Sequence, residues 1–136
     1  MTRRALLLFA LSLVAAACGR DGGPVPPWSA VHVEGSTIVL EGNRALRALE
    51  VDLAWDSGLT VSGFSAGADV ARLNLVRSFV PADAQQARVL ISDTRKVRMP
   101  SHGEVLKVTV AGSGTLRVTA AQAADVDGKV VAVEVR

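Results

Sequence analysis

Few residues in this chain have the types and spacing that metal binding or catalysis requires. The 136 residues include one cysteine, Cys18, and two histidines, His32 and His102. A zinc site needs three or four ligands from cysteine, histidine and carboxylates, and neither histidine lies at metal-ligand spacing from further ligands. We predict that His32 lies on the solvent side of a strand and His102 in a loop. No catalytic residue and no cofactor is assigned.

Asp125 and Asp127 form the one carboxylate pair that is typical of a cation site. Carboxylate oxygens are preferred ligands of Ca²⁺, but an EF-hand loop has 12 residues and ends in a glutamate, and that loop is missing here. Asp127 is followed by Gly128, a dipeptide that favours tight hairpin turns. A turn is therefore the preferred interpretation, and calcium binding by Asp125 and Asp127 is the open alternative.

Other chemistries lack their sequence signals. No nucleophile-elbow motif surrounds a serine, and the Gly-Ser-Gly segment 112–114 is not followed by the lysine of a phosphate loop. The formal net charge is +2, but without Arg3 and Arg4 the basic and acidic residues balance. The basic segment 95–98 is typical of a solvated loop or edge strand. We therefore expect neither an enzyme nor a nucleic-acid-binding protein.

Sugar binding usually needs exposed aromatic side chains as stacking platforms. The chain has no tyrosine, three phenylalanines and two tryptophans. We predict that Trp55 and Phe64 belong to the core and that Trp28 packs against the first strand. A carbohydrate-binding module is therefore possible but unsupported.

The N-terminal residues have the pattern of an export signal. A basic start at residues 1–4 is followed by an uncharged apolar run at 5–14, then by three alanines before Cys18. The run is too short for a stable membrane span. The segment resembles the lipobox of bacterial lipoproteins, which implies cleavage after residue 17 and a lipid on Cys18.

That resemblance has consequences for location. It implies an exported protein of the cell envelope whose first partner is the membrane, held through acyl chains. Gly19 stands where an aspartate often signals inner-membrane retention, so the outer membrane is favoured in a bacterium with two membranes. Residues 18–28, rich in glycine and proline, are expected to form a tether.

The remaining residues, 29–136, alternate between apolar and polar types, which indicates strands. Leu49, Val51, Leu53 and Trp55 are predicted to share one face of the clearest strand. A hairpin is expected across 112–114, and helical turns at 69–73 and 81–86. The predicted strands are 31–33, 37–41, 49–55, 59–64, 73–80, 87–92, 105–111, 115–121 and 129–135. With a single cysteine excluding an internal disulfide, this predicts an all-β sandwich of eight to nine strands held by packing.

Several short motifs occur in the order found in cohesin domains. They are the alternating strand 46–56 ending in Trp-Asp, the strand 59–61, the glycine of 65–67, the segment 101–108 and the closing segment 123–128. The region from about residue 30 to 136 thus resembles cohesin-like domains, which implies a jelly-roll β-sandwich. These domains share a superfamily with some carbohydrate-binding modules.

The resemblance also implies a protein-binding face. In cohesins that bind dockerins, the outward side of the long strand contributes polar contacts, and the matching positions here are Ala48, Glu50 and Asp52. Ala48 departs from that polar pattern. We therefore expect a non-catalytic binding module with an unidentified protein partner. The alternative is a structural component of a secretion or pilus assembly in the envelope.

Overall fold

The computed structural model describes residues 25–71, 76–79, 85–92 and 99–136. Cys18, the signal segment, residues 18–24 of the expected tether and the basic segment 95–98 lie outside these ranges. So do parts of the predicted strand 73–80 and of the predicted turn 81–86. Within the described ranges, no helix is long and apolar enough to cross a bilayer.

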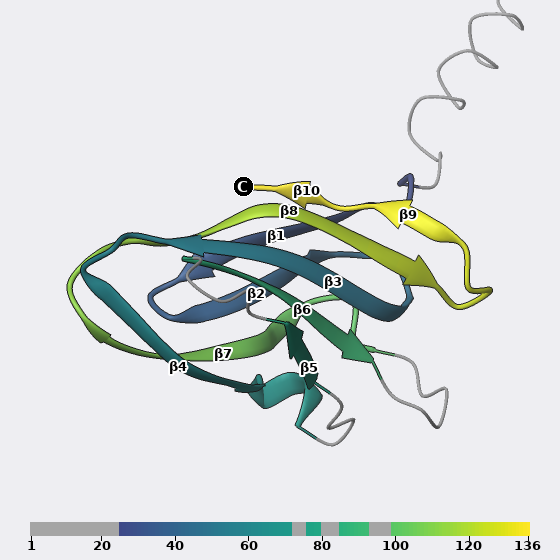
Figure 1. Cartoon of the computed structure of the whole chain (residues 1–136). Helices are drawn as coiled ribbons and strands as arrows, with labels where there is room; N and C mark the ends of the chain where they lie inside the picture. The colour runs from purple at the N-terminus through teal and green to yellow at the C-terminus, as the bar shows by residue number, and fades with distance from the viewer. Residues whose placement is uncertain (1–24, 72–75, 80–84, 93–98) are drawn as a thin grey trace, which may run out of the picture.

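Ten strands and one short 3₁₀ helix make up the described part of the chain (Figure 1). The elements are β1 (Ser29–Glu34), β2 (Thr37–Gly42), β3 (Leu46–Trp55), β4 (Leu59–Ala66), η1 (Ala68–Val70), β5 (Val76–Phe79), β6 (Gln86–Ser92), β7 (Gly103–Gly112), β8 (Leu116–Asp125), β9 (Val130–Ala132) and β10 (Glu134–Val135). They confirm the all-β prediction, and η1 overlaps the first residues of the helical turn expected at 69–73.

The strands form two five-stranded sheets that face each other as a sandwich. Sheet A has the order β10-β1-β2-β7-β4, and sheet B has the order β5-β6-β3-β8-β9. The described strand pairs are antiparallel except for β1 with β10, which is parallel. Consecutive strands often lie in opposite sheets, which is the arrangement expected of a jelly roll.

The core lies between the two sheets because each strand turns one row of apolar side chains inward. In β3, Leu49 and Val51 are fully buried and Trp55 is 7% exposed. The intervening Glu50 and Asp52 are only partly covered. The two-residue period predicted for this strand is therefore confirmed. Phe64 is partly buried against the same core.

The predicted hairpin at 112–114 is wrong, because β7 and β8 belong to different sheets. The turn instead carries the chain from sheet A to sheet B. The turn 56–58 after β3 also crosses between the sheets, and the two turns lie side by side at one end of the sandwich (Figure 1). The amide of Ser113 donates to the carbonyl of Gly58 at 3.1 Å. Glycine-rich turns of this length fit a hairpin and a sheet crossing equally well, so the spacing alone could not separate them.

Asp56 joins these two crossing turns. Its carboxylate accepts hydrogen bonds from the amide of Thr115 at 2.8 Å and from Nη1 of Arg117 at 3.0 Å. The amide of Asp56 donates in return to the carbonyl of Thr115. The backbone hydrogen bond from Thr115, followed by the contact with Arg117, lowers the pKa of the Asp56 carboxyl. Thus one side chain holds the ends of β3 and β8 together.

The predicted last strand, 129–135, is divided into two strands, which accounts for ten strands in place of eight or nine. β9 pairs with β8 in sheet B, whereas β10 pairs with β1 in sheet A. Val133 lies between them and is buried. Alternation continues through the crossing because Val131 and Val133 both face the core, so the sequence pattern shows no interruption.

Candidate binding face on sheet B

The predicted interaction residues Ala48, Glu50 and Asp52 lie on the outward side of β3, the central strand of sheet B. The antiparallel register places residues of β6 and β8 on either side of each of them. Ordered as β6, β3 and β8, the rows are Ser92–Ala48–Ala124, Leu90–Glu50–Gln122 and Arg88–Asp52–Ala120. We call these nine residues the sheet B face.

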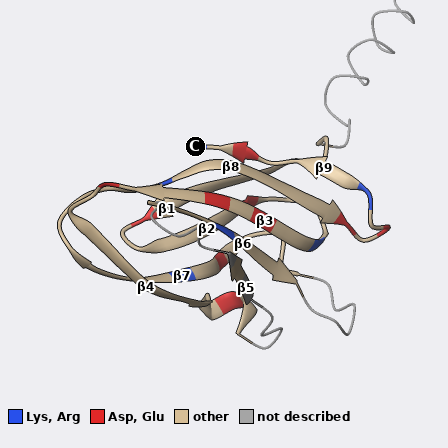
Figure 2. Ribbon diagram, in the orientation of Figure 1, with Lys and Arg blue, Asp and Glu red and all other residues tan. Residues whose placement is uncertain are grey.

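Charged groups occupy one half of the sheet B face. Arg88 binds Asp52 through two hydrogen bonds, from Nε to Oδ1 at 2.8 Å and from Nη2 to Oδ2 at 3.1 Å. The same Nε lies 3.6 Å from Oε1 of Glu50. Glu50 also accepts a hydrogen bond from Nε2 of Gln122 at 3.2 Å. Figure 2 shows the acidic positions as red segments on β3.

These contacts hold the charged side chains in one arrangement. The hydrogen bond to Asp52, with the nearby charges of Asp52 and Glu50, raises the pKa of Arg88. The guanidinium is therefore charged under all ordinary conditions. Two carboxylates face a single guanidinium, so this half of the face carries one negative charge in excess.

Two adjoining hollows mark the surface over β3. The first, of 160 Å³, is lined by Glu50, Asp52, Arg88, Ala120, Ala121 and Gln122. The second, of 120 Å³, shares Glu50 and Gln122 with the first and is otherwise lined by Ala48, Leu90, Ala123, Ala124 and Val130. Val130 is 68% exposed. The face therefore passes from a polar half to an apolar half, and the predicted residues take part in both.

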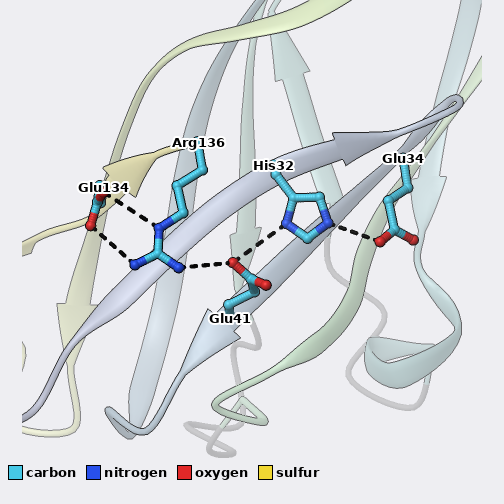
Figure 3. Close-up of polar contacts among 5 residues, drawn as sticks. All are labelled: His32, Glu34, Glu41, Glu134 and Arg136. Atoms are coloured by element: carbon cyan, nitrogen blue, oxygen red, sulfur yellow. Dashed lines mark hydrogen bonds and ion pairs between the residues drawn. The ribbon is translucent and has the colours of Figure 1, made fainter.

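A second polar cluster lies on the outward side of sheet A (Figure 3). His32 lies between two carboxylates, with Nε2 2.9 Å from Glu34 and Nδ1 3.6 Å from Glu41. Arg136 contacts Glu41 and Glu134 at 3.4 Å each, and the hydrogen bond with Glu134 raises its pKa. The position of His32 confirms that it lies on the outward side of its strand.

His102 and its neighbour Ser101 lie just before β7. Oγ of Ser101 is 3.2 Å from Nδ1 of His102. A hydrolytic triad also needs a carboxylate that orients the histidine, and the described residues show no hydrogen bond from His102 to one. The geometry is that of two adjacent polar side chains in an exposed turn.

Asp125 stabilises the turn between β8 and β9. Its Oδ1 accepts hydrogen bonds from the amides of Asp127 and Lys129, each at 2.9 Å. The amide of Gly128 donates to the carbonyl of Asp125 at 2.9 Å. The favoured turn is therefore present. Nowhere in the described ranges do three or more His, Cys, Asp or Glu residues gather closely enough to hold a metal ion.

The segment before β1 is tied to the loop after β2. The carbonyl of Trp28 accepts from the amides of Asn43 and Arg44, and Arg44 also donates to the carbonyl of Pro27. The Trp28 side chain is 37% exposed, and the guanidinium of Arg136 lies 5.0 Å from its ring centre. The Trp28 ring thus packs against Arg136, and Trp28 itself directly precedes the first residue of β1.

Sequence reasoning found the β3 side of the sheet B face but missed its partners on β6 and β8. Arg88 and Leu90 alternate with buried residues of β6, namely Ala87, Val89 and Ile91. The two-residue period therefore predicts that Arg88 and Leu90 point outward. Their position beside Asp52 and Glu50 depends on strand order and register. Neither follows from a local pattern, because β3 and β6 are separated by two other strands.

No family model and no curated protein matches this chain, whereas solved structures do. A chain of the type I cohesin–dockerin complex from Clostridium thermocellum superposes with a TM-score of 0.64 at 14% identity, covering 85% of this chain and 94% of that one. The non-cellulosomal cohesin of Archaeoglobus fulgidus gives 0.63 at 17% identity, covering 82% and 86%. The cohesin module of a Clostridium perfringens family 33 glycoside hydrolase gives 0.57 at 15% identity, covering 83% and 100%. The described sandwich therefore has a cohesin-like fold.

Proposed function

We propose that this chain is a non-catalytic binding module, anchored to the cell envelope through Cys18, whose sheet B face docks a protein partner. The observation that carries the proposal is the sheet B face itself. It is a continuous outward surface across three central strands, with a fixed charged half beside an apolar half. Specific protein interfaces combine an apolar contact area with a few oriented polar groups.

The cohesin-like fold supports a protein as the partner, because one of the similar structures is a cohesin–dockerin complex. The charges of the sheet B face indicate which side chains the partner would present to it. Glu50 and Asp52 exceed Arg88 by one negative charge, so a lysine or arginine of the partner would complement the polar half. The apolar half, formed by Ala48, Leu90 and Ala124 with Val130 of β9 beside it, would receive an apolar side chain.

Site-specific photo-cross-linking in the producing cell tests the docking face. A photo-reactive residue at Gln122, in the sheet B face, should give a discrete cross-linked species with one partner. The additional substitution Glu50→Arg should abolish that species, because it reverses the charge next to the reactive position. The matched control is the same photo-reactive residue at Thr109, an exposed position of sheet A. Equal cross-linking from both faces would contradict the proposal.

The lipid anchor has a separate test. Cys18→Ala should release the chain from the membrane fraction and abolish incorporation of a labelled fatty acid, because the thioether has no other acceptor in a chain with one cysteine. An alanine variant at neighbouring Gly19 should keep the label. Unlabelled wild-type protein would disprove the anchor and leave the docking face untouched.

A further inference from the structure

The four edge strands of the sandwich differ greatly in length. β10 has two residues, β9 has three and β5 has four, whereas β4 has eight. Within the described residues, β4 forms strand pairs with β7 on one side only. Figure 1 shows it running along the margin of the sandwich. Alternate backbone groups of β4 are therefore directed away from the sheet.

β4 lacks two of the devices by which proteins usually protect such an edge, namely charged side chains and proline. Its sequence, Leu-Thr-Val-Ser-Gly-Phe-Ser-Ala, contains no charged residue and no proline, and β4 has neither red nor blue segments in Figure 2. Natural edge strands are commonly short, or carry lysine or proline, because unprotected edges pair with other strands. The three other edges are short, so β4 is the exception.

Gly63 provides a second, independent observation. It is absent from the residues with positive φ, and a Cβ built at Gly63 would meet no atom within 4 Å. Neither a positive φ nor internal packing therefore requires glycine here. Glycine within a strand commonly marks a bulge or a place where another backbone approaches closely, and Gly63 lies at a bulge of β4.

A bulge between Val61 and Gly63 makes the strand symmetric about its midpoint. Val61 and Phe64 both pack toward the core, although three positions apart they would lie on opposite faces of a regular strand. Thr60 and Ser65 are both exposed. Read from either end, β4 presents the same order of inward and outward side chains.

We propose that β4 pairs with β4 of a second copy of this chain, antiparallel and about a two-fold axis between Ser62 and Gly63. This register sets Thr60 opposite Ser65 and Val61 opposite Phe64. Hydroxyl pairs and pairs of aromatic and β-branched side chains both stabilise antiparallel strands. The interface is isologous, so no second surface is required.

The pairing joins sheet A of one copy to sheet A of the other in a continuous sheet. The outward side of sheet B is not consumed, so the sheet B face of each copy stays free. The inference is therefore independent of the proposed function. A self-pair also fits the absence of charge on β4, because like charges opposite one another would oppose it.

Disulfide trapping tests the register in the full chain, purified in mild detergent and carrying Cys18→Ser. Thr60→Cys and Ser65→Cys are made in separate proteins. Mixed and oxidised, they should give a disulfide-linked dimer, because opposite residues of paired strands lie within disulfide range. Each variant oxidised alone should remain monomeric, since its two cysteines would be five positions apart, about 17 Å. Association of the micelles alone would link all three samples equally.

A charge on the edge provides the counter-test. Ser62→Lys in both partners should abolish the mixed disulfide, whereas Thr119→Lys, at an exposed position of sheet B, should leave it intact. Far-ultraviolet circular dichroism confirms that both lysine variants keep their strands. Cross-linking of the single variants as efficient as that of the mixture would overturn the proposal. So would a mixture that stays monomeric, or a dimer that survives Ser62→Lys.

Discussion

At the scale of single residues, Asp56 combines three functions that a turn residue rarely has together. Its backbone begins the crossing from sheet B to sheet A, its carboxylate caps the amide of Thr115, and it pairs with Arg117. The side chain is still 49% exposed. Trp-Asp was part of the sequence resemblance to cohesins, and the structure gives a physical reason for an aspartate at this position.

The lowered pKa of Asp56 predicts a pH-dependent contribution to stability. A carboxyl whose pKa is lower in the folded than in the unfolded chain stabilises the fold above its ordinary pKa of 3.8. That contribution is lost as the pH falls through the lowered value. Asp56→Asn should therefore lower the urea midpoint at neutral pH, and the difference from wild type should shrink below about pH 4.

The urea midpoints of wild type and Asp56→Asn are compared from neutral pH to below about pH 4. Asp127→Asn serves as the control, because only the amide of Asp127 takes part in its turn. It should follow the wild-type curve throughout. A difference between Asp56→Asn and wild type that stays constant down to pH 2 would show that the carboxylate charge contributes nothing.

Gly67 is a residue whose type is explained by the close approach of a neighbouring strand, which leaves no room for a side chain. A Cβ at this position would collide with the carbonyl oxygen of Glu104, a backbone atom that cannot move without shifting β7. Gly67→Ala should therefore lower the free energy of unfolding by about 1–3 kcal/mol, the usual cost of overpacking. Gly63→Ala, with open space around the new methyl group, is the matched control. Thermal unfolding should show a lower unfolding temperature for Gly67→Ala than for Gly63→Ala. The protein concentration is kept low so that the proposed pairing of β4 does not contribute. Equal losses of stability in the two variants would refute the explanation.

At the scale of elements, the sequence predicted what local alternation determines. β3 was located because its apolar residues recur every second position and face the core. The path of the chain between sheets was not predictable in the same way. A glycine-rich turn connects β7 to β8 across the core, and Val133 continues an unbroken alternation through a change of sheet. In both places the local pattern is the same for either topology, and long-range pairing decides between them.

The same limit applies to the candidate site. Ala48, Glu50 and Asp52 were predicted from the resemblance and lie together on β3. Arg88 and Gln122, which hold the two carboxylates in place, come from strands far away in the sequence. The two-residue period predicts that Arg88 and Gln122 point outward. That they lie beside Asp52 and Glu50 depends on strand order and register.

The central position of β3 predicts a steep cost for truncating its inward side chains. Leu53 is 1% exposed and lies between the sheets. Leu53→Ala should lower the free energy of unfolding by about 2–5 kcal/mol, through lost burial and the cavity left behind. Ala54→Ser, on the outward side of the same strand, should change it by about 0.5 kcal/mol or less. Chemical denaturation checks both, and a similar effect at the two positions would mean that the strand's faces are assigned wrongly.

At the scale of the whole molecule, the C-terminal residues connect parts that are distant in sequence. β9 belongs to sheet B and β10 to sheet A, so the chain links the two sheets after Val133. The amide of Arg136 donates to the carbonyl of Val31 at 2.9 Å, and its guanidinium covers the ring of Trp28. The segment that precedes β1 is thus held by the last residue of the described chain.

This link predicts that residues 134–136 protect Trp28 from solvent. Deleting them removes both the parallel pairing with β1 and the guanidinium over the ring, so acrylamide quenching of tryptophan fluorescence should increase. Trp55, the other tryptophan, is 7% exposed and contributes little to the change. Arg136→Ala keeps the backbone pairing and should raise quenching while leaving the unfolding temperature closer to wild type than the deletion does. If quenching is the same in all three proteins, Trp28 owes its environment to the loop at Asn43 and Arg44 alone, and the C-terminal strand serves only to complete sheet A.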